Sequence, residues 1–270
     1  MQNITLPQKP KYTAIGENHG KFEILGCYPG YGTTLGNALR RVLLSSLDGV
    51  AAQSVKINGV AHEFSTIAGV MEDVVQIILN VKQVRFKLHG NEAVKVTVKN
   101  KGEGVVTAGD IKASSDVEIV NPDQVIATVT DKKTVFEMEI EIDRGIGYVP
   151  VETREREERD DREIGHIAID AIYTPVKRVN YEIENMRVGK RTDYDKVTLE
   201  IVTDGSIDPI QAFEKSVTIL VSQFSSLIDG AGSEKRVQGD EVASLNADAE
   251  VKKSEKKVTK KKSVKATEEE

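Results

Sequence analysis

A glycine-rich turn that leads directly into an amphipathic helix is the feature that most restricts how this chain can fold. The segment spans residues 30–46 and reads GYGTTLGNALRRVLLSS. The apolar residues of its helical part are Leu35, Leu39, Val42 and Leu43. Their steps of four, three and one place them on one stripe of a helix with about 3.6 residues per turn. The sequence therefore predicts a helix over about 32–47 with one buried face.

Two adjacent arginines, Arg40 and Arg41, lie in the same helix. Neighbouring residues of a helix point about 100° apart, so at least one of the two leaves the apolar stripe. A guanidinium fixed in this way can bind a carboxylate of a partner through two hydrogen bonds. We interpret this helix as a recognition surface for another protein.

A second amphipathic helix is predicted over residues 208–228. Asp208 is suited to the N-cap. Pro209 is suited to the first helical position, where a backbone N–H would have no acceptor within the helix. Its apolar stripe consists of Ile210, Phe213, Val217, Leu220, Val221, Phe224, Leu227 and Ile228. This stripe is wider and longer than packing on one sheet face usually requires. A shorter helix is predicted over residues 71–84 from the same kind of spacing.

Strand alternation accounts for most of the remaining sequence. Residues 12–28 predict two strands joined by a turn, and residues 51–64 predict a second hairpin around Asn58 and Gly59. Alternating apolar residues with glycine, aspartate and proline turns make residues 93–149 largely β.

The stretch that follows the β-rich region is highly charged. Residues 153–163 read TREREERDDRE, which predicts a solvated loop that buries nothing. Strand alternation returns over residues 167–183 and 196–202. Together these elements predict an α+β fold.

Charge is distributed unevenly along the chain. The net charge is −6, but residues 251–266 carry eight lysines and one glutamate, and residues 267–270 carry three more glutamates, which leaves −10 for residues 1–250. An acidic body binds nucleic acid poorly, so it more plausibly meets protein. Beyond residue 229 the sequence offers too little apolar surface for a packed domain. The basic segment is either a solubilising tail or a DNA contact without sequence preference.

Enzyme chemistry finds little support in the sequence. Gly30, Gly32 and Gly36 lie between a strand and a helix, but their spacing fits neither a dinucleotide fingerprint nor a phosphate loop, so we read them as a close-packing turn. A nucleotide-binding enzyme that uses this turn is one alternative. A free-standing nucleic-acid-binding protein that uses the basic tail is another.

Metal and covalent sites are likewise not indicated. The four histidines are scattered, and no pair has the spacing of a helical metal site. Ser45 and Ser46 lack a nucleophile-elbow pattern, and Cys27 lacks a nearby base. A single cysteine, together with the absence of a signal peptide or a long apolar run, predicts a reducing cytoplasm and no membrane contact.

Several blocks of sequence resemble the N-terminal domain of the alpha subunit of bacterial DNA-directed RNA polymerase. The blocks are GYGTTLGNALRRVLLSS at 30–46, INGVAHEFSTIAGVMEDVVQIILNVK at 57–82, RGIGYVP at 144–150, and DAIYTPVKRVNYEIENMRVGKRTDYDKVTLEIVTDGSIDP at 170–209. They occur in family order, and with the closing helix they cover most of residues 10–229. The C-terminal helical domain of the family has no counterpart in residues 230–270.

The resemblance implies a discontinuous architecture. Residues 1–50 and 170–229 would form a dimerisation domain made of a sheet and two long helices. Residues 51–169 would form an inserted β-rich domain, and residues 230–270 a disordered charged tail. The two long helices would pair two identical chains, which explains the oversized stripe. The implied interface residues are Tyr31, Leu35, Leu39, Val42, Phe213, Val217, Leu220, Phe224 and Leu227.

The resemblance also implies an assembly function. The dimer would recruit the beta and beta-prime subunits of the polymerase, with Arg40, Arg41, Leu44, Lys82 and Ile169 as docking residues. The chain itself would carry no catalytic residue, bind no cofactor and hold no metal, and the catalytic magnesium would lie on a large subunit. Promoter DNA would be met through the complex, in the bacterial cytoplasm. Its possible contacts in this chain are Lys252, Lys253, Lys256, Lys257, Lys260, Lys261 and Lys262.

Overall fold

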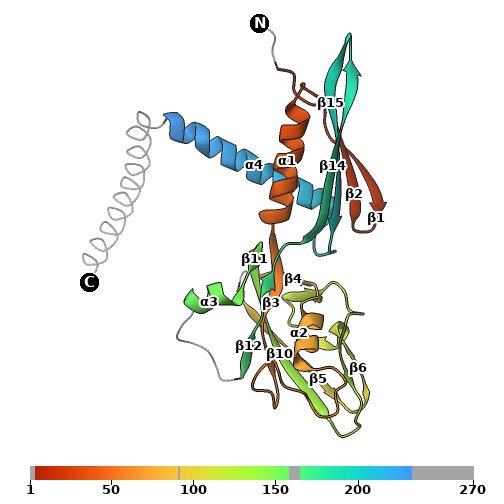
Figure 1. Cartoon of the computed structure of the whole chain (residues 1–270), viewed down its shortest axis with the longest axis vertical. Coiled ribbons are helices and arrows are strands. Elements are labelled where there is room, and N and C mark those ends of the chain that lie inside the picture. Colours follow the sequence, from red (N-terminus) through yellow and green to blue (C-terminus); the bar gives the residue numbers. More distant parts are fainter. Residues whose placement is uncertain (1–3, 91, 158–164, 233–270) are drawn as a thin grey trace, which may run out of the picture. The chain divides into compact units, whose positions relative to one another are not determined.

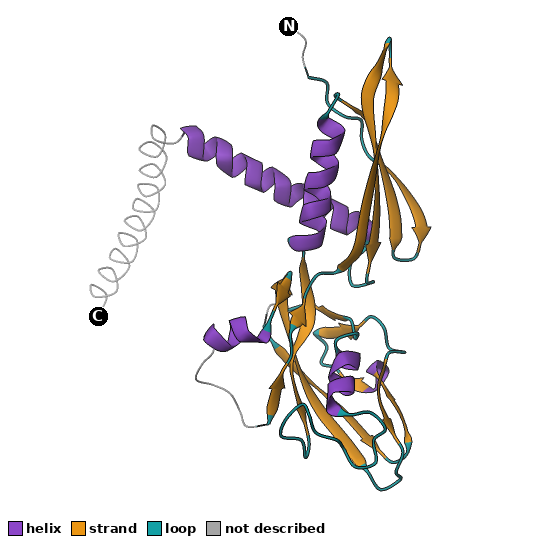
Figure 2. Cartoon of the chain, in the orientation of Figure 1, coloured by secondary structure: helices purple, strands orange, loops and turns teal. Residues whose placement is uncertain are grey.

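The computed structural model describes residues 4–90, 92–157 and 165–232, with mixed helices and strands as predicted (Figure 2). It divides into two compact units, 1–220 and 221–270. The described part of the second unit is the C-terminal part of one helix. The lysine-rich segment, which is predicted to be either a solubilising tail or a DNA contact, lies outside the described residues.

One antiparallel sheet contains four strands in the order β1-β2-β15-β14 (Figure 1). They are β1 (Lys11–Gly16), β2 (His19–Cys27), β14 (Val176–Val188) and β15 (Arg191–Thr203). The predicted pair of strands over residues 12–28 is confirmed, because β1 and β2 pair directly. The later strand alternation is confirmed by β14 and β15, which are the last two strands of the chain and pair as a long hairpin.

Helix α1 (Tyr31–Ser45) follows β2 and packs against β14 and β15 (Figure 1). It begins and ends within two residues of its predicted bounds. Helix α4 (Pro209–Gly232) confirms the predicted start, because Oδ1 of Asp208 accepts a hydrogen bond from the Ile210 N–H at 2.8 Å. The ring of Phe213 stacks on Phe22, with 4.4 Å between the ring centroids. The core of this sheet and its helices includes Phe22, Leu39, Leu43, Leu199, Ile201 and Phe213.

A second antiparallel sheet has the strand order β12-β3-β10-β5-β7. Its strands are β3 (Asp48–Ile57), β5 (Val94–Lys101), β7 (Ile111–Lys112), β10 (Val135–Ile146) and β12 (His166–Ala168). Three two-stranded sheets lie around it: β4 (Phe86–Leu88) with β8 (Val117–Ile119), β6 (Gly104–Thr107) with β9 (Val125–Val129), and β11 (Tyr148–Val149) with β13 (Ala171–Ile172). These strands confirm the predicted β-rich region.

The helices of this second region are short: α2 (Val74–Val81), the 3₁₀ turn η1 (Ala108–Asp110) and α3 (Val151–Glu157). Helix α2 is shorter than predicted. Its N-cap is Asp73, whose side chain accepts a hydrogen bond from the Gln76 N–H at 2.7 Å. Glu72 therefore precedes the helix, and its carboxylate accepts hydrogen bonds from the N–H and hydroxyl groups of Thr128. The apolar residues on the inner side of α2 join a separate core with Val55, Met138, Ile140 and Ile142.

The predicted hairpin over residues 51–64 is wrong. Gly59 does adopt a left-handed conformation, with φ of 81°, so the turn exists. The chain does not return alongside β3, because the two edges of β3 are occupied by β10 and β12. Both partners are distant in sequence, which a local turn signal cannot reveal.

The prediction that residues 153–163 form a solvated loop that buries nothing is also wrong for the described part. Residues up to Glu157 form α3, whose first turn is fixed by the N–H of Val151 donating to Oδ1 of Asp170 at 3.1 Å. Arg154 donates to the carbonyl oxygens of Gln53 and Ile169. Glutamate and arginine favour helix, so the charged run becomes helical where it has a neighbour to bind.

The two cores thus belong to two sheets, consistent with the predicted α+β class. One core lies between the four-stranded sheet and helices α1 and α4. The other is formed by the five-stranded sheet together with α2, β4 and β9. The domain limits at residues 51 and 169 stay a prediction.

Candidate subunit interface

Two glycines let α1 lie very close to its sheet. A Cβ atom on Gly32 would lie 2.7 Å from Cβ of Asp195, and one on Gly36 would lie 2.6 Å from Cδ2 of Tyr181. Both distances are shorter than real Cβ contacts, so these positions exclude larger residues without a shift. The glycines therefore serve close packing, as their spacing in the sequence predicts.

The same turn is unsuited to a phosphate. The N–H groups of Gly30 and Gly32 both donate to Oδ2 of Asp195 at 3.0 Å. A phosphate at this helix N-terminus would have to displace a carboxylate that already binds the N–H groups it needs. This geometry argues against the nucleotide-binding alternative.

Helix α1 divides its apolar residues between the core and the surface. Leu39 is only 5% exposed and Leu43 is fully buried, so both pack inside their own chain. Tyr31 is 43% exposed, while Leu35 and Val42 are half-buried. Arg40 and Arg41 are both exposed. The helix therefore carries an apolar and a cationic surface beyond what its own sheet covers.

Helix α4 changes character along its length. Ala212, Phe213 and Ser216 are buried against the four-stranded sheet, and Leu220 is half-buried against the same core. In the second unit every described side chain is exposed, although the helix stays apolar. Phe224 is 60% exposed and Leu227 is 67% exposed.

Burial separates two of the expected interface residues, Leu39 and Phe213, from the others. Leu39 and Phe213 have almost no surface left to offer a second chain, because both complete the core of their own chain. Helical periodicity identifies an apolar stripe but cannot divide it between an internal and an external neighbour. Tyr31, Val217, Phe224 and Leu227 fit an external contact, since each is exposed.

The expected docking residues are placed unevenly as well. Leu44 is half-buried against the core of the four-stranded sheet. Nζ of Lys82 lies 3.4 Å from Oδ2 of Asp170, so its charge already has a partner. Ile169 is 2% exposed, so its side chain packs inside this chain, and its docking contact stays a prediction.

Asp170 belongs to this region too, although the sequence pattern does not predict it, and its carboxylate is the group that makes the contacts. It accepts hydrogen bonds from the N–H of Val151 and from Lys82. The backbone N–H of Val151 is the main cause of its lowered pKa, and the charge of Lys82 adds to it. It thereby joins α3, the end of α2 and the segment before β13. No sequence signal marks it, because its partners are 88 and 19 residues away.

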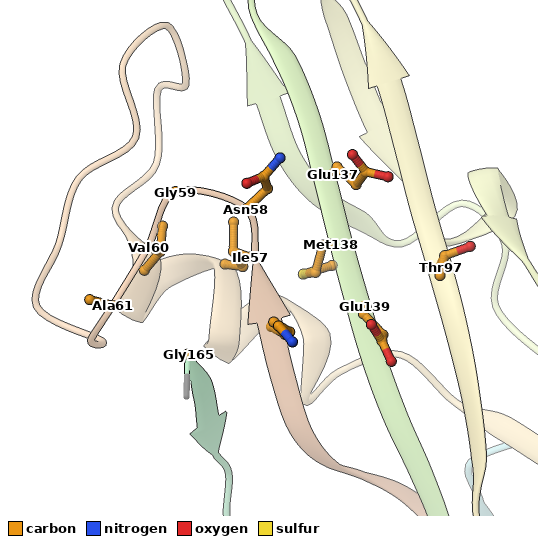
Figure 3. Close-up of a pocket in the computed structure, with 11 residues that line it drawn as sticks. Ile57, Asn58, Gly59, Val60, Ala61, Thr97, Glu137, Met138, Glu139 and Gly165 are labelled. Atoms are coloured by element: carbon orange, nitrogen blue, oxygen red, sulfur yellow. The ribbon is translucent and has the colours of Figure 1, made fainter. Parts of the chain in front are cut away.

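A cavity of about 480 Å³ opens elsewhere, beside the end of β3 (Figure 3). Its lining includes Lys56, Asn58, Val60, Thr97, Glu137 and Glu139. The carboxylates of Glu137 and Glu139 lie 3.0 and 3.8 Å from the amino groups of Lys99 and Lys95. Each carboxylate therefore belongs to an ion pair on the sheet surface, and the two do not form a catalytic pair.

No group of three or more histidine, cysteine, aspartate or glutamate side chains is placed to hold a metal ion in residues 4–90, 92–157 and 165–232. Within those ranges no helix has the length and apolar character needed to cross a membrane.

Comparisons with known proteins agree with one another. The family described as the RNA polymerase Rpb3/RpoA insert domain matches residues 55–174. The DNA-directed RNA polymerase subunit alpha of Roseiflexus castenholzii is 48% identical over 229 residues, which are 85% of this chain and 69% of the relative. The subunits of the same name from Alkaliphilus oremlandii and Moorella thermoacetica are 51% and 46% identical, over 79% and 91% of this chain and 67% and 76% of theirs. This chain belongs to the family of DNA-directed RNA polymerase alpha subunits.

Proposed function

We propose that this chain is a homodimeric scaffold on which the large subunits of an RNA polymerase assemble. The observation that carries the proposal is the apolar surface that each long helix leaves uncovered. Tyr31 on α1 is exposed, and so are Val217, Phe224 and Leu227 on α4. Exposed aromatic and aliphatic residues gathered on one element are typical of protein interfaces.

The cationic part of α1 supports a second contact in the same proposal. Arg40 and Arg41 are exposed on a helix that is held tightly by its own sheet. A guanidinium on a rigid element can bind a carboxylate of a partner with little loss of side-chain freedom. We assign this contact to the beta subunit, with Leu44 beside it, and the recruitment of beta-prime to the assembled dimer.

We further propose that the chain takes no direct part in nucleotidyl transfer. It would bind no cofactor, and the catalytic magnesium would be held by a large subunit. The paired carboxylates on the surface of the second sheet support this view, since each already has a lysine partner. Assaying the isolated chain with magnesium, template and nucleotides should give no RNA product, whereas the reconstituted complex should.

Pairing is tested by placing charge in the exposed part of α4. The double variant Phe224→Asp with Leu227→Asp should be monomeric by light scattering, because a dimer would bury two carboxylates from each chain without partners. Phe64→Asp is the matched control, since Phe64 is 80% exposed on a loop of the second region. The control should remain dimeric. A monomeric wild-type chain at tens of micromolar would contradict the proposal.

Docking is tested by capture of purified beta subunit on the tagged chain. Arg41→Ala should lower the amount captured by roughly tenfold or more, as expected for the loss of a central charged contact. Lys190→Ala serves as the control, because Lys190 is exposed in the turn between β14 and β15. Both variants should stay dimeric. Equal capture by the two variants would remove Arg41 from the docking surface.

A further inference from the structure

The N-terminus of α1 is capped by a side chain from a distant strand. Oδ2 of Asp195, in β15, accepts hydrogen bonds from the N–H groups of Gly30 and Gly32, each at 3.0 Å. Gly30 is the N-cap residue of the helix, and it has no side chain with which to cap it. Thr33 and Thr34 lie inside the helix, so no neighbour in sequence replaces the cap.

Asp195 is well suited to fix this end of the helix. It is buried, and its Cβ would collide with any side chain at Gly32. The first N–H groups of a helix need partners, and a carboxylate there also interacts favourably with the helix dipole. Because β15 is an inner strand of the four-stranded sheet, the carboxylate is held by a rigid element.

The first turn that Asp195 holds also carries Tyr31. The ring of Tyr31 packs edge-on against Tyr28, with 6.0 Å between centroids, and Tyr28 packs in the same way against Tyr194 at 6.2 Å. Tyr194 is the neighbour of Asp195 in the chain. Tyr31 is thus the exposed outermost ring of a short aromatic series whose inner end lies beside the cap.

We propose that Asp195 is a positioning residue for pairing of the two chains. By capping α1 it keeps the first turn helical and holds Tyr31 at the pairing surface. This inference rests on the proposed homodimer and adds to it a residue that does not itself contact the second copy. Without the cap the first turn frays, and ordering Tyr31 becomes part of the cost of association.

The test compares Asp195→Ala with Asp195→Asn in the full chain. Asn keeps an oxygen that can accept the same two hydrogen bonds, whereas Ala removes the acceptor. Glu182→Ala is the control, because it removes an exposed carboxylate from the adjacent strand β14. Sedimentation gives the dimer dissociation constant, and amide hydrogen exchange reports on residues 30–35 separately from α4.

For Asp195→Ala we expect faster exchange confined to the first turn of α1 and a dissociation constant raised roughly fivefold to tenfold, the range of a lost helix cap. Asp195→Asn should lie within about threefold of the wild type, since it retains the cap hydrogen bonds. If Asp195→Ala unfolds, Asp195→Ser takes its place in the same comparison.

Three results would overturn the inference. The first is a dimer dissociation constant of Asp195→Ala equal to that of the wild type, and the second is unchanged amide exchange in the first turn of its α1. The third is a dissociation constant of Asp195→Asn as high as that of Asp195→Ala. A wild-type chain that is itself monomeric overturns the proposed homodimer, whatever the variants do. A dimeric wild type with unaffected variants overturns only the role of Asp195.

Discussion

At the scale of single residues, Gly32 and Gly36 set the distance between α1 and its sheet. The spacing of the glycines predicts a close-packing function for the glycine-rich turn, and the contacts with Asp195 and Tyr181 supply the reason. The identity of those contacts was not predictable, because both lie more than 140 residues further along the chain.

Gly36→Ala should destabilise the chain by about 1 to 3 kcal/mol, because the added methyl group would overlap the ring of Tyr181. Urea denaturation followed by far-UV circular dichroism measures the change. Thr34→Ala, at an exposed position of the same helix, should stay within about 0.5 kcal/mol of the wild type. Equal stability of the two variants would mean that the helix can move away at little cost.

At the scale of elements, one ion pair joins α4 to the start of β3. Nζ of Lys215 lies 2.9 Å from Oδ1 of Asp48. The hydrogen bond from Lys215 is the main cause of the lowered pKa of Asp48, ahead of the opposing effect of partial burial. A carboxyl group whose pKa is lower in the folded state stabilises that state above its unfolded pKa, which is about 3.9.

Asp48→Asn should therefore lower the free energy of unfolding at pH 7 by a few tenths up to about 1 kcal/mol, since the pair is partly exposed. The gap between variant and wild type should close as the pH falls below about 4, through the folded pKa of Asp48. Urea titrations at several values between pH 7 and pH 3 give both curves. A gap that persists unchanged at pH 3 would assign the loss to something other than this ion pair.

Elements were predictable where the signal is local. The start of α4 follows from Asp208 and Pro209, which act on the N–H groups next to them. The helix α3 was missed because its stability depends on Asp170 and on the carbonyl oxygens that Arg154 binds. The hairpin at Gly59 failed for a related reason, since the turn is real but the strand partners come from elsewhere.

At the scale of the whole molecule, charge separates the chain into an acidic part and a basic segment. Residues 251–266 carry eight lysines, and they lie outside the described residues. We propose that this segment adds a contact to DNA in the assembled polymerase that does not depend on sequence. Such a contact releases counterions, so it changes how binding depends on salt.

Replacing the lysines of residues 251–266 by glutamine should weaken DNA binding by the assembled enzyme and flatten its salt dependence. Each lost phosphate contact should reduce the slope of log K against log salt by about 0.9. Fluorescence anisotropy over a range of salt concentrations measures both quantities. The control is a variant in which Glu268, Glu269 and Glu270 are replaced by glutamine. An unchanged slope in the lysine variant would contradict the DNA contact and leave a solubilising function for the segment.

The sequence by itself determined the class of the fold and the family, because helical and strand periodicity, caps and family motifs are all written in neighbouring residues. It also predicted that at least one of Arg40 and Arg41 lies on the helix surface, and the structure shows that both are exposed. Only the tertiary structure decided that Leu39, Phe213 and Ile169 are internal, that Lys82 is paired, and that Asp195 caps α1. Those outcomes depend on which distant segment lies opposite each residue, and burial and pairing are properties of that neighbour as much as of the residue.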